Sequence, residues 1–102
     1  MIRDLLNMYD GMIKQITRPV EQVGRDKVGG FIISTLYTYD KGFETAILDS
    51  IGAHPVERYD SKESAEVGHK KWTAAASGLK EVMKLGYGEL AEDKMITLQP
   101  MQ

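Results

Sequence analysis

Residues 30–59, GFIISTLYTYDKGFETAILDSIGAHPVERY, decide the fold of this chain. From Phe31 to Tyr39 two sets of side chains alternate, and β-branched and aromatic residues dominate, as in a half-buried strand. A DKG turn follows, with glycine where a positive φ is needed, and residues 43–49 return as a second strand. After another turn, residues 56–59 form a short third strand. The sequence therefore predicts a three-stranded antiparallel meander over about residues 30–59.

A helical repeat follows the meander directly. Asp60 or Ser61 can accept hydrogen bonds from the free amides of a first helical turn. Apolar side chains then recur at spacings of three and four, at Ala65, His69, Trp72, Ala76, Leu79 and Met83. Gly86 is positioned to end the helix in left-handed geometry. We therefore expect a long helix over about residues 61–85, packed on one face of the sheet. The expected core consists of Phe31, Ile33, Ala65, His69, Trp72 and Leu79.

The two ends of the chain give weaker patterns. An apolar stripe at helical spacing runs from Ile2 to Ile16 and predicts an N-terminal helix, although Gly11 could already end it. Residues 18–27 mix charges with Pro and Gly, which favours an irregular or partly extended connection. The predicted fold class is therefore α+β, with one domain over residues 1–88. Residues 89–102 form a tail that is either flexible or adds an edge strand.

Composition excludes several classes of protein. The 102 residues suffice for one domain, and the absence of cysteine rules out disulfides, thiol nucleophiles and thiolate metal sites. Residues 1–41 carry six Lys or Arg against five Asp or Glu, and residues 42–102 carry seven against ten. Neither half is a basic arm or an acidic tail. No apolar run reaches the roughly 18 residues of a membrane span, and no secretory signal begins the chain, so we expect a cytoplasmic protein.

Four short motifs carry a resemblance to a known family. They are Ser34-Thr35, Phe43-Glu44-Thr45, Arg58-Tyr59 and Gly68-His69. Their order resembles the pattern STV, FETMVF, RYST and EEAxxGH of a family of small, uncharacterised proteins encoded by phages and prophages. The resemblance covers about residues 30–72, and the chain differs from the family in its shorter turn before Phe43. It implies a viral origin, a strand-strand-strand-helix unit and a location in the host cytoplasm, but assigns no residue a role.

Catalytic patterns are missing from the sequence. Serine does not occur in a nucleophile elbow, and the glycines form neither a phosphate loop nor a dinucleotide fingerprint. The two histidines lack the spacing of metal ligands; we expect His54 in an exposed turn and His69 in the core. Asp49 and Glu57 could face each other across neighbouring strands, but exposed acid pairs are usually solvated. We therefore expect neither an enzyme nor a bound metal or cofactor.

Two functions remain open. The first is a non-catalytic module of a phage that binds another protein, such as a host factor or defence component. Its candidate interface is the Tyr and Arg mixture that protein interfaces favour, Tyr37, Tyr39, Arg58 and Tyr59. The second is a module for a nucleotide or nucleic acid, in which a dimer gathers Arg18, Arg25, Lys27 and Lys41 around phosphate. A chain this small buries a modest share of its surface, so we also expect a homodimer.

Overall fold

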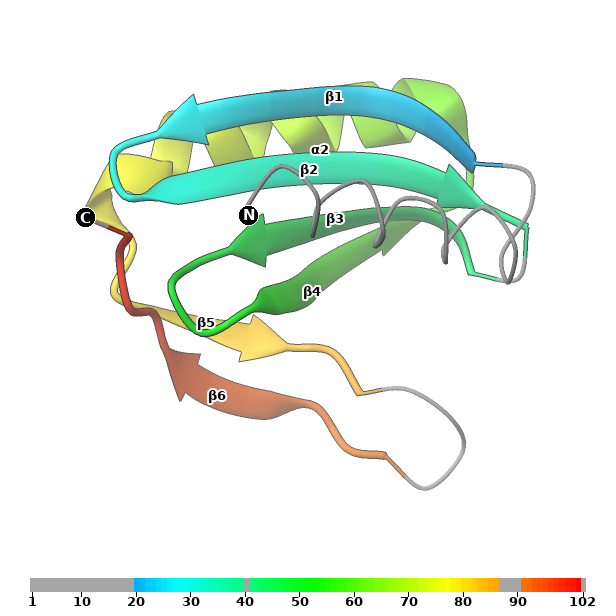
Figure 1. Ribbon diagram of the computed structural model, residues 1–102. Coiled ribbons are helices and arrows are strands. Elements are labelled where there is room, and N and C mark those ends of the chain that lie inside the picture. Colours follow the sequence, from blue (N-terminus) through cyan, green and yellow to red (C-terminus); the bar gives the residue numbers. More distant parts are fainter. Residues whose placement is uncertain (1–19, 40, 87–90, 102) are drawn as a thin grey trace, which may run out of the picture.

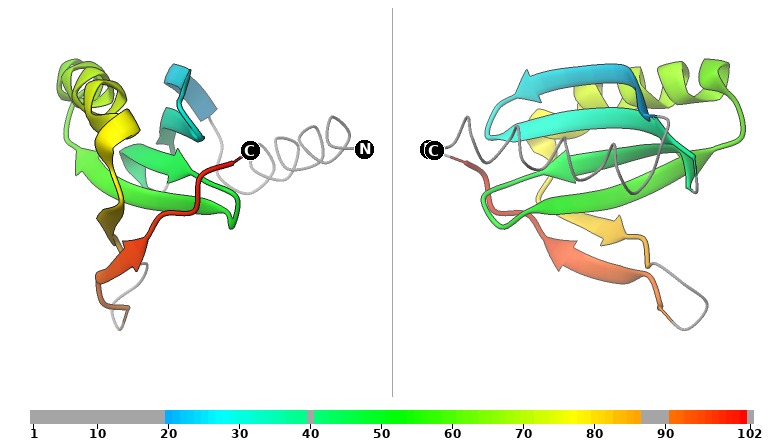
Figure 2. Two further views of the ribbon diagram at one scale, coloured as in Figure 1. Left: turned by 90° about the vertical axis from the view of Figure 1, so that its left-hand side faces the viewer. Right: turned by 45° about the vertical axis from the view of Figure 1, so that its right-hand side comes forward.

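The computed structural model describes residues 20–39, 41–86 and 91–101. Its elements in chain order are β1 (Val20–Val28), β2 (Phe31–Thr38), β3 (Gly42–Leu48), β4 (Ala53–Tyr59), α2 (Lys62–Ala75), the 3₁₀ helix η1 (Ala76–Gly78), β5 (Glu81–Lys84) and β6 (Lys94–Thr97). The first four strands form one antiparallel sheet in the order β1-β2-β3-β4, and β5 and β6 form a separate antiparallel ribbon (Figure 1). α2 lies across one face of the four-stranded sheet (Figure 2).

Strand β1 corrects the predicted three-stranded meander. Residues 18–27 were expected to be an irregular or partly extended connection, but residues 20–28 pair with β2 from Val20 opposite Thr38 to Val28 opposite Phe31. The register shifts between Gln22 and Gly24, so a bulge interrupts the alternation that marks a strand in a sequence. Charged residues are also typical of an edge strand, which faces solvent along one side. The sheet therefore has four strands, and the predicted number was wrong.

Helix α2 corrects the predicted long helix. It begins after Ser61, whose hydroxyl accepts a hydrogen bond from the Ser64 amide, but it ends at Ala75. The backbone turns extended at Leu79, with ψ near 135°, and continues as β5. The apolar repeat continues past the end of the helix because Leu79 packs against the same core from extended backbone. Met83, the last residue of the predicted repeat, is 47% exposed, and its neighbour Val82 is buried instead. The expected N-terminal helix lies outside the described residues.

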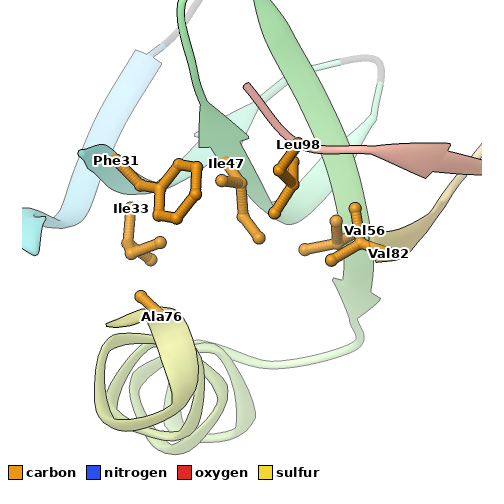
Figure 3. Packing of buried hydrophobic residues seen from close by; sticks show 7 residues of the cluster. All are labelled: Phe31, Ile33, Ile47, Val56, Ala76, Val82 and Leu98. Carbon is orange, nitrogen blue, oxygen red and sulfur yellow. The ribbon is translucent and has the colours of Figure 1, made fainter. Parts of the chain in front are cut away.

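The hydrophobic core lies between the sheet and the segment that follows α2. Residues of β2 and β3 that point toward α2 meet side chains from β4, η1, β5 and the segment after β6 (Figure 3). The buried members are Phe31, Ile33, Ile47, Val56, Ala76, Val82 and Leu98. Half-buried Val28, Trp72, Leu79 and Ile96 pack around them. Of the residues predicted for the core, Ala65 and His69 are also buried, nearer the start of the helix.

Residues 98–101 connect the ribbon to the sheet. β6 pairs with β5 along its length, and the Leu98 amide then donates to the Lys80 carbonyl. Farther along, the Gln99 carbonyl accepts from the Ser50 amide, and the Met101 amide donates to the Gly30 carbonyl. The segment predicted as a tail or edge strand therefore contributes a strand to the ribbon and a side chain to the core.

Candidate functional site

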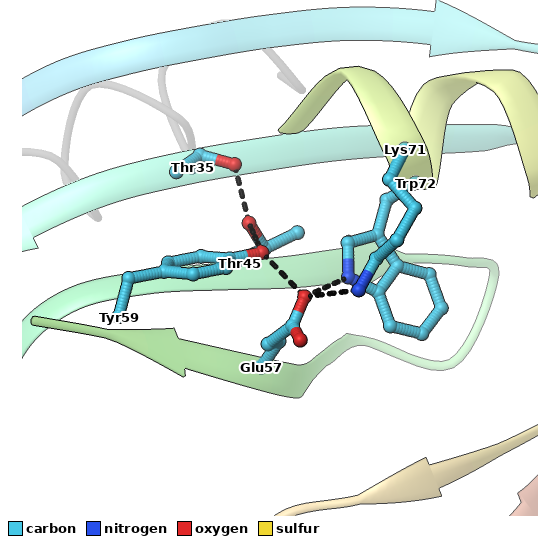
Figure 4. A network of polar contacts seen from close by, with 6 residues as sticks. All are labelled: Thr35, Thr45, Glu57, Tyr59, Lys71 and Trp72. Atoms are coloured by element: carbon cyan, nitrogen blue, oxygen red, sulfur yellow. Dashed lines mark hydrogen bonds and ion pairs between the residues drawn. The ribbon is translucent and has the colours of Figure 1, made fainter. Parts of the chain in front are cut away.

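A row of polar side chains crosses the sheet beneath the first half of α2. At its centre, Thr35 of β2 lies opposite Thr45 of β3, and their hydroxyl oxygens are 2.6 Å apart (Figure 4). Both threonines are completely buried, at 0% exposure. No water can reach either hydroxyl, so each depends on its protein neighbours for hydrogen bonds.

Toward β4 the row ends at Glu57. The Tyr59 hydroxyl lies 2.9 Å from Thr45 Oγ1 and donates to Glu57 Oε1, which also accepts from Lys71 Nζ at 2.7 Å and from Trp72 Nε1 at 2.9 Å. Burial raises the pKa of Glu57, but these three hydrogen bonds outweigh burial and hold the pKa below its usual value. Burial and the neighbouring Glu57 raise the pKa of Tyr59 to about 12. At neutral pH this end is a carboxylate beside a neutral phenol.

Toward β1 the row ends at Asp26. The ring of His69, from α2, lies over β1 and β2. Its Nδ1 atom is 2.7 Å from Thr35 Oγ1, and its Nε2 atom is 2.6 Å from Asp26 Oδ2. Gly24 makes room for the ring, since a Cβ there would lie 2.6 Å from its Cδ2 and Nε2 atoms. Nothing in the sequence pattern pointed to Asp26, because its place beside His69 depends on the pairing of β1 with β2, where Asp26 lies opposite Ile33.

The order Asp26, His69, Thr35 matches the acid, base and hydroxyl of a nucleophilic triad. Catalysis by such a triad requires the hydroxyl to reach a substrate carbonyl. Here the Thr35 hydroxyl is sealed under α2 and lies against Thr45. The arrangement can hold and transfer protons along the row, but it offers no substrate access to the nucleophile.

A second imidazole and carboxylate pair closes the turn between β3 and β4. Asp49 accepts hydrogen bonds from His54 Nε2 and from the amides of Ile51, Gly52 and Gln99. Burial raises the pKa of Asp49, but these hydrogen bonds together lower it to about 2. The prediction that His54 lies exposed in a turn was wrong, since it lies in β4 and is 6% exposed. Asp49 therefore stabilises the turn between β3 and β4 and holds the segment after β6 against it. It does not face Glu57, so the two residues do not form the acid pair considered from the sequence.

The opposite face of the sheet is covered by no described helix or strand (Figure 2). Its centre consists of the small, buried Ser34 surrounded by half-buried apolar side chains, which are Ile32 and Leu36 from β2 and Ala46 and Leu48 from β3. Along β1, Arg25 and Lys27 are exposed and share this face, because they pair with Ser34 and Ile32. At the other edge, Arg58 donates to Glu44 at 2.8 Å. The face is therefore apolar in the middle and basic along β1.

The four predicted interface residues do not form one surface. Tyr37 contacts Phe43 on the side of α2, with ring centroids 4.7 Å apart and ring planes inclined at 50°. Tyr39 is 73% exposed beyond the end of β2. Tyr59 lies under α2 in the polar row, whereas Arg58 points to the other face of the sheet. Arg58 and Tyr59 are adjacent in β4, and adjacent residues of a strand point to opposite faces of the sheet.

The predicted phosphate ligands are likewise only partly brought together. Arg25 and Lys27 lie on one face of β1. Lys41 lies in the turn after β2, separated from Lys27 by roughly 20 Å of strand at about 3.3 Å per residue. Arg18 lies outside the described residues. The described part of the chain therefore offers two neighbouring cations for a phosphate.

Other site types find little support among residues 20–39, 41–86 and 91–101. Two shallow depressions of about 390 and 400 Å³ flank the start of α2, and exposed Val67 borders both. The described residues contain no group of three or more His, Asp or Glu side chains placed to hold a metal ion. No helix among them has the length and apolar character needed to cross a membrane.

Comparisons with known proteins found no matching family model, no matching curated protein and no matching solved structure.

Proposed function

We propose that the protein is a non-catalytic module that binds another protein through the sheet face opposite α2. The observation that carries the proposal is the composition of this face, with apolar side chains in the centre and exposed Arg25 and Lys27 along one edge. Protein interfaces combine an apolar centre with charged groups at the rim. The buried Thr35 hydroxyl argues in the same direction, since the triad-like row lacks access to substrate.

The charge of the face selects the partner. Burying the apolar centre favours a partner segment with apolar side chains, and the cations of β1 favour carboxylates along its flank. The partner in this proposal is therefore a protein that presents an acidic, amphipathic segment. The resemblance to phage-encoded proteins adds that this partner belongs to the host cell, as a host factor or defence component.

Affinity capture with matched variants tests the proposal. The face variant combines Arg25→Glu with Lys27→Glu, and the control combines Lys70→Glu with Lys80→Glu, which reverses two exposed cations elsewhere. We expect a host protein to be retained by the parent and the control but lost by the face variant. Calorimetry with the purified partner should then show at least tenfold weaker binding to the face variant, about 1.4 kcal/mol.

Three results contradict the proposal. The first is capture of no protein by the parent, and the second is equal capture by all three baits. The third is self-association of the parent that the face variant abolishes, measured by sedimentation velocity, because the occupant is then a second copy of this chain. The same experiment includes a variant that lacks residues 1–16. Stronger capture by this variant would mean that residues 1–16 compete with the partner for the same face.

A phosphate ligand is the second candidate, favoured only by the shared orientation of Arg25 and Lys27. Titration with a labelled oligonucleotide at two salt concentrations separates it from the first. Phosphate recognition requires affinity that falls steeply with salt and weakens in Arg25→Ala. No binding at about 50 mM salt, where such contacts are strongest, excludes the oligonucleotide.

A further inference from the structure

The polar row beneath α2 contains one hydrogen bond more than the number of protons that its side chains carry when His69 is neutral. Five contacts join its six groups in sequence, from Asp26 through His69, Thr35, Thr45 and Tyr59 to Glu57, at distances of 2.6 to 2.9 Å. Each hydrogen bond needs one proton. Each hydroxyl brings one proton, and a neutral imidazole also brings one. Both ends are carboxylates, which bring none, so a neutral His69 leaves four protons for five contacts.

The directions of the hydrogen bonds show where the missing proton belongs. Tyr59 donates to Glu57, so its oxygen can only accept from Thr45. Thr45 must then accept from Thr35, and Thr35 in turn must accept from His69 Nδ1. The His69 Nε2 atom faces the Asp26 carboxylate at 2.6 Å, where only a second ring proton can make a hydrogen bond.

We propose that the folded protein keeps this fifth proton on His69, so that its ring is an imidazolium held between Thr35 and Asp26. The charged groups around the ring fit this assignment. Asp26 of β1 faces it directly, β2 and β3 contribute only neutral hydroxyls, and Glu57 of β4 is already bonded to Lys71. On α2 itself, the neighbouring Glu66 and Lys70 are exposed.

Loss of the fifth proton must break one of the five contacts. Water cannot replace a partner at Thr35 or Thr45, which are completely buried. The Asp26 side chain is 59% exposed, so water can replace the imidazole there at the lowest cost. The row therefore acts as a pH-sensitive latch that fastens edge strand β1 to α2 when His69 is charged and releases Asp26 when it is neutral.

The sign of the pH dependence follows from the proton count. The folded state holds a proton that histidine in an unfolded chain gives up near pH 6.5. The contact between β1 and α2 is therefore tightest while the proton is bound, and it loosens at Asp26 when the folded protein releases the proton.

The second histidine provides an internal reference. His54 Nε2 lies 2.9 Å from the Asp49 carboxylate, but its Nδ1 atom is buried and has no hydrogen-bond partner within the described part of the chain. A second proton on this ring would have no acceptor, so His54 is expected to be neutral, with its proton on Nε2. The two histidines both contact an aspartate, but only His69 has a hydrogen-bond partner at each ring nitrogen among the described residues.

Nitrogen-detected NMR of the two imidazole rings tests the proposal, because the three protonation states of histidine give distinct ¹⁵N shifts. In the parent at pH 7, we expect His69 to show protons on both ring nitrogens and His54 on Nε2 only. Tyr59→Phe removes one hydroxyl and two contacts, leaving three contacts for three protons with a neutral His69. We therefore expect His69 in this variant to bind its second proton about tenfold more weakly, the cost of one missing buried hydrogen bond.

Two further variants make the result decisive. Thr45→Val keeps the shape of the side chain but removes one hydroxyl and two contacts, which again leaves three contacts for three protons with a neutral His69. It should therefore weaken proton binding by His69 in the same way even if Tyr59→Phe fails to fold. Tyr37→Phe removes a tyrosine hydroxyl outside the row and should leave His69 unchanged. A single ring proton on His69 in the parent at pH 7 overturns the proposal. Equal proton binding by His69 in the parent, Tyr59→Phe and Thr45→Val overturns it as well.

Discussion

At the scale of single residues, Asp49 concentrates the most hydrogen bonds on one side chain. It accepts from three backbone amides and from His54, and its pKa of about 2 lies nearly two units below the usual 3.8. The carboxylate therefore stabilises the fold by about 2 kcal/mol above pH 3.8, and this stabilisation is lost as the pH falls toward 2. Urea denaturation between pH 7 and pH 2 should show the loss in the parent. A parent profile that matches the one of Asp49→Asn contradicts this role.

Trp72 joins the polar row to the hydrophobic core. Its ring packs against the core cluster while its Nε1 donates to Glu57. Because Trp72 is half-buried, we expect Trp72→Ala to lower the free energy of unfolding by about 2 to 3 kcal/mol, less than a fully buried aromatic costs. Trp72→Phe keeps most of the packing and should cost about 1 kcal/mol. Chemical denaturation measures both, and a Trp72→Ala variant as stable as the parent refutes the assignment.

At the scale of elements, the contact between α2 and β4 depends on a glycine. Gly68 is buried, and a methyl group at this position would collide with the ring of Tyr59. We expect Gly68→Ala to destabilise the protein by about 2 kcal/mol, since overpacking outweighs the gain in helix propensity. Gly78→Ala is the matched control, because nothing lies within 4 Å of the added methyl group. Thermal unfolding should separate the two, and equal midpoints would show that α2 can shift freely on the sheet.

The elements also show how far the sequence predicts the structure. The hairpin of β2 and β3 follows from strict alternation, and the Ser61 cap follows from local chemistry. The end of α2 does not, because Leu79 continues the apolar repeat of the helix although its backbone is extended. Periodicity records which side chains are buried, and here two backbone geometries bury them against one core.

The candidate site was less predictable than the fold. Burial of His69 was expected from its place on the apolar stripe of α2. Its partners come from two other elements, and Asp26 reaches it only because residues 20–28 form a strand paired with β2. The open basic face was missed for the same reason, since it requires residues 20–28 to be a strand. Long-range register is a property of the assembled sheet and has no local signal in one sequence.

At the scale of the whole molecule, Leu98 closes the core from a distant part of the chain. It is 5% exposed and meets residues of β2, β3, β4 and β5 in one cluster. We expect Leu98→Ala to lower the free energy of unfolding by about 3 kcal/mol through the cavity that it creates. Met95→Ala, in the same ribbon but 60% exposed, should change it by less than about 0.5 kcal/mol. Equal denaturation midpoints for the two variants would mean that the ribbon is not part of the cooperative unit.

The hydrogen bonds of residues 98–101 also constrain the order in which parts of the protein fold. These residues leave the ribosome after every element that they join, and the bond from the Gln99 amide to Asp49 spans 50 positions. Such distant closures are entropically unfavourable and slow. When β5 has just been synthesised, one end of the core is therefore exposed until residues 98–101 have been synthesised as well. During that interval the chain depends on chaperones or on speed to avoid aggregation.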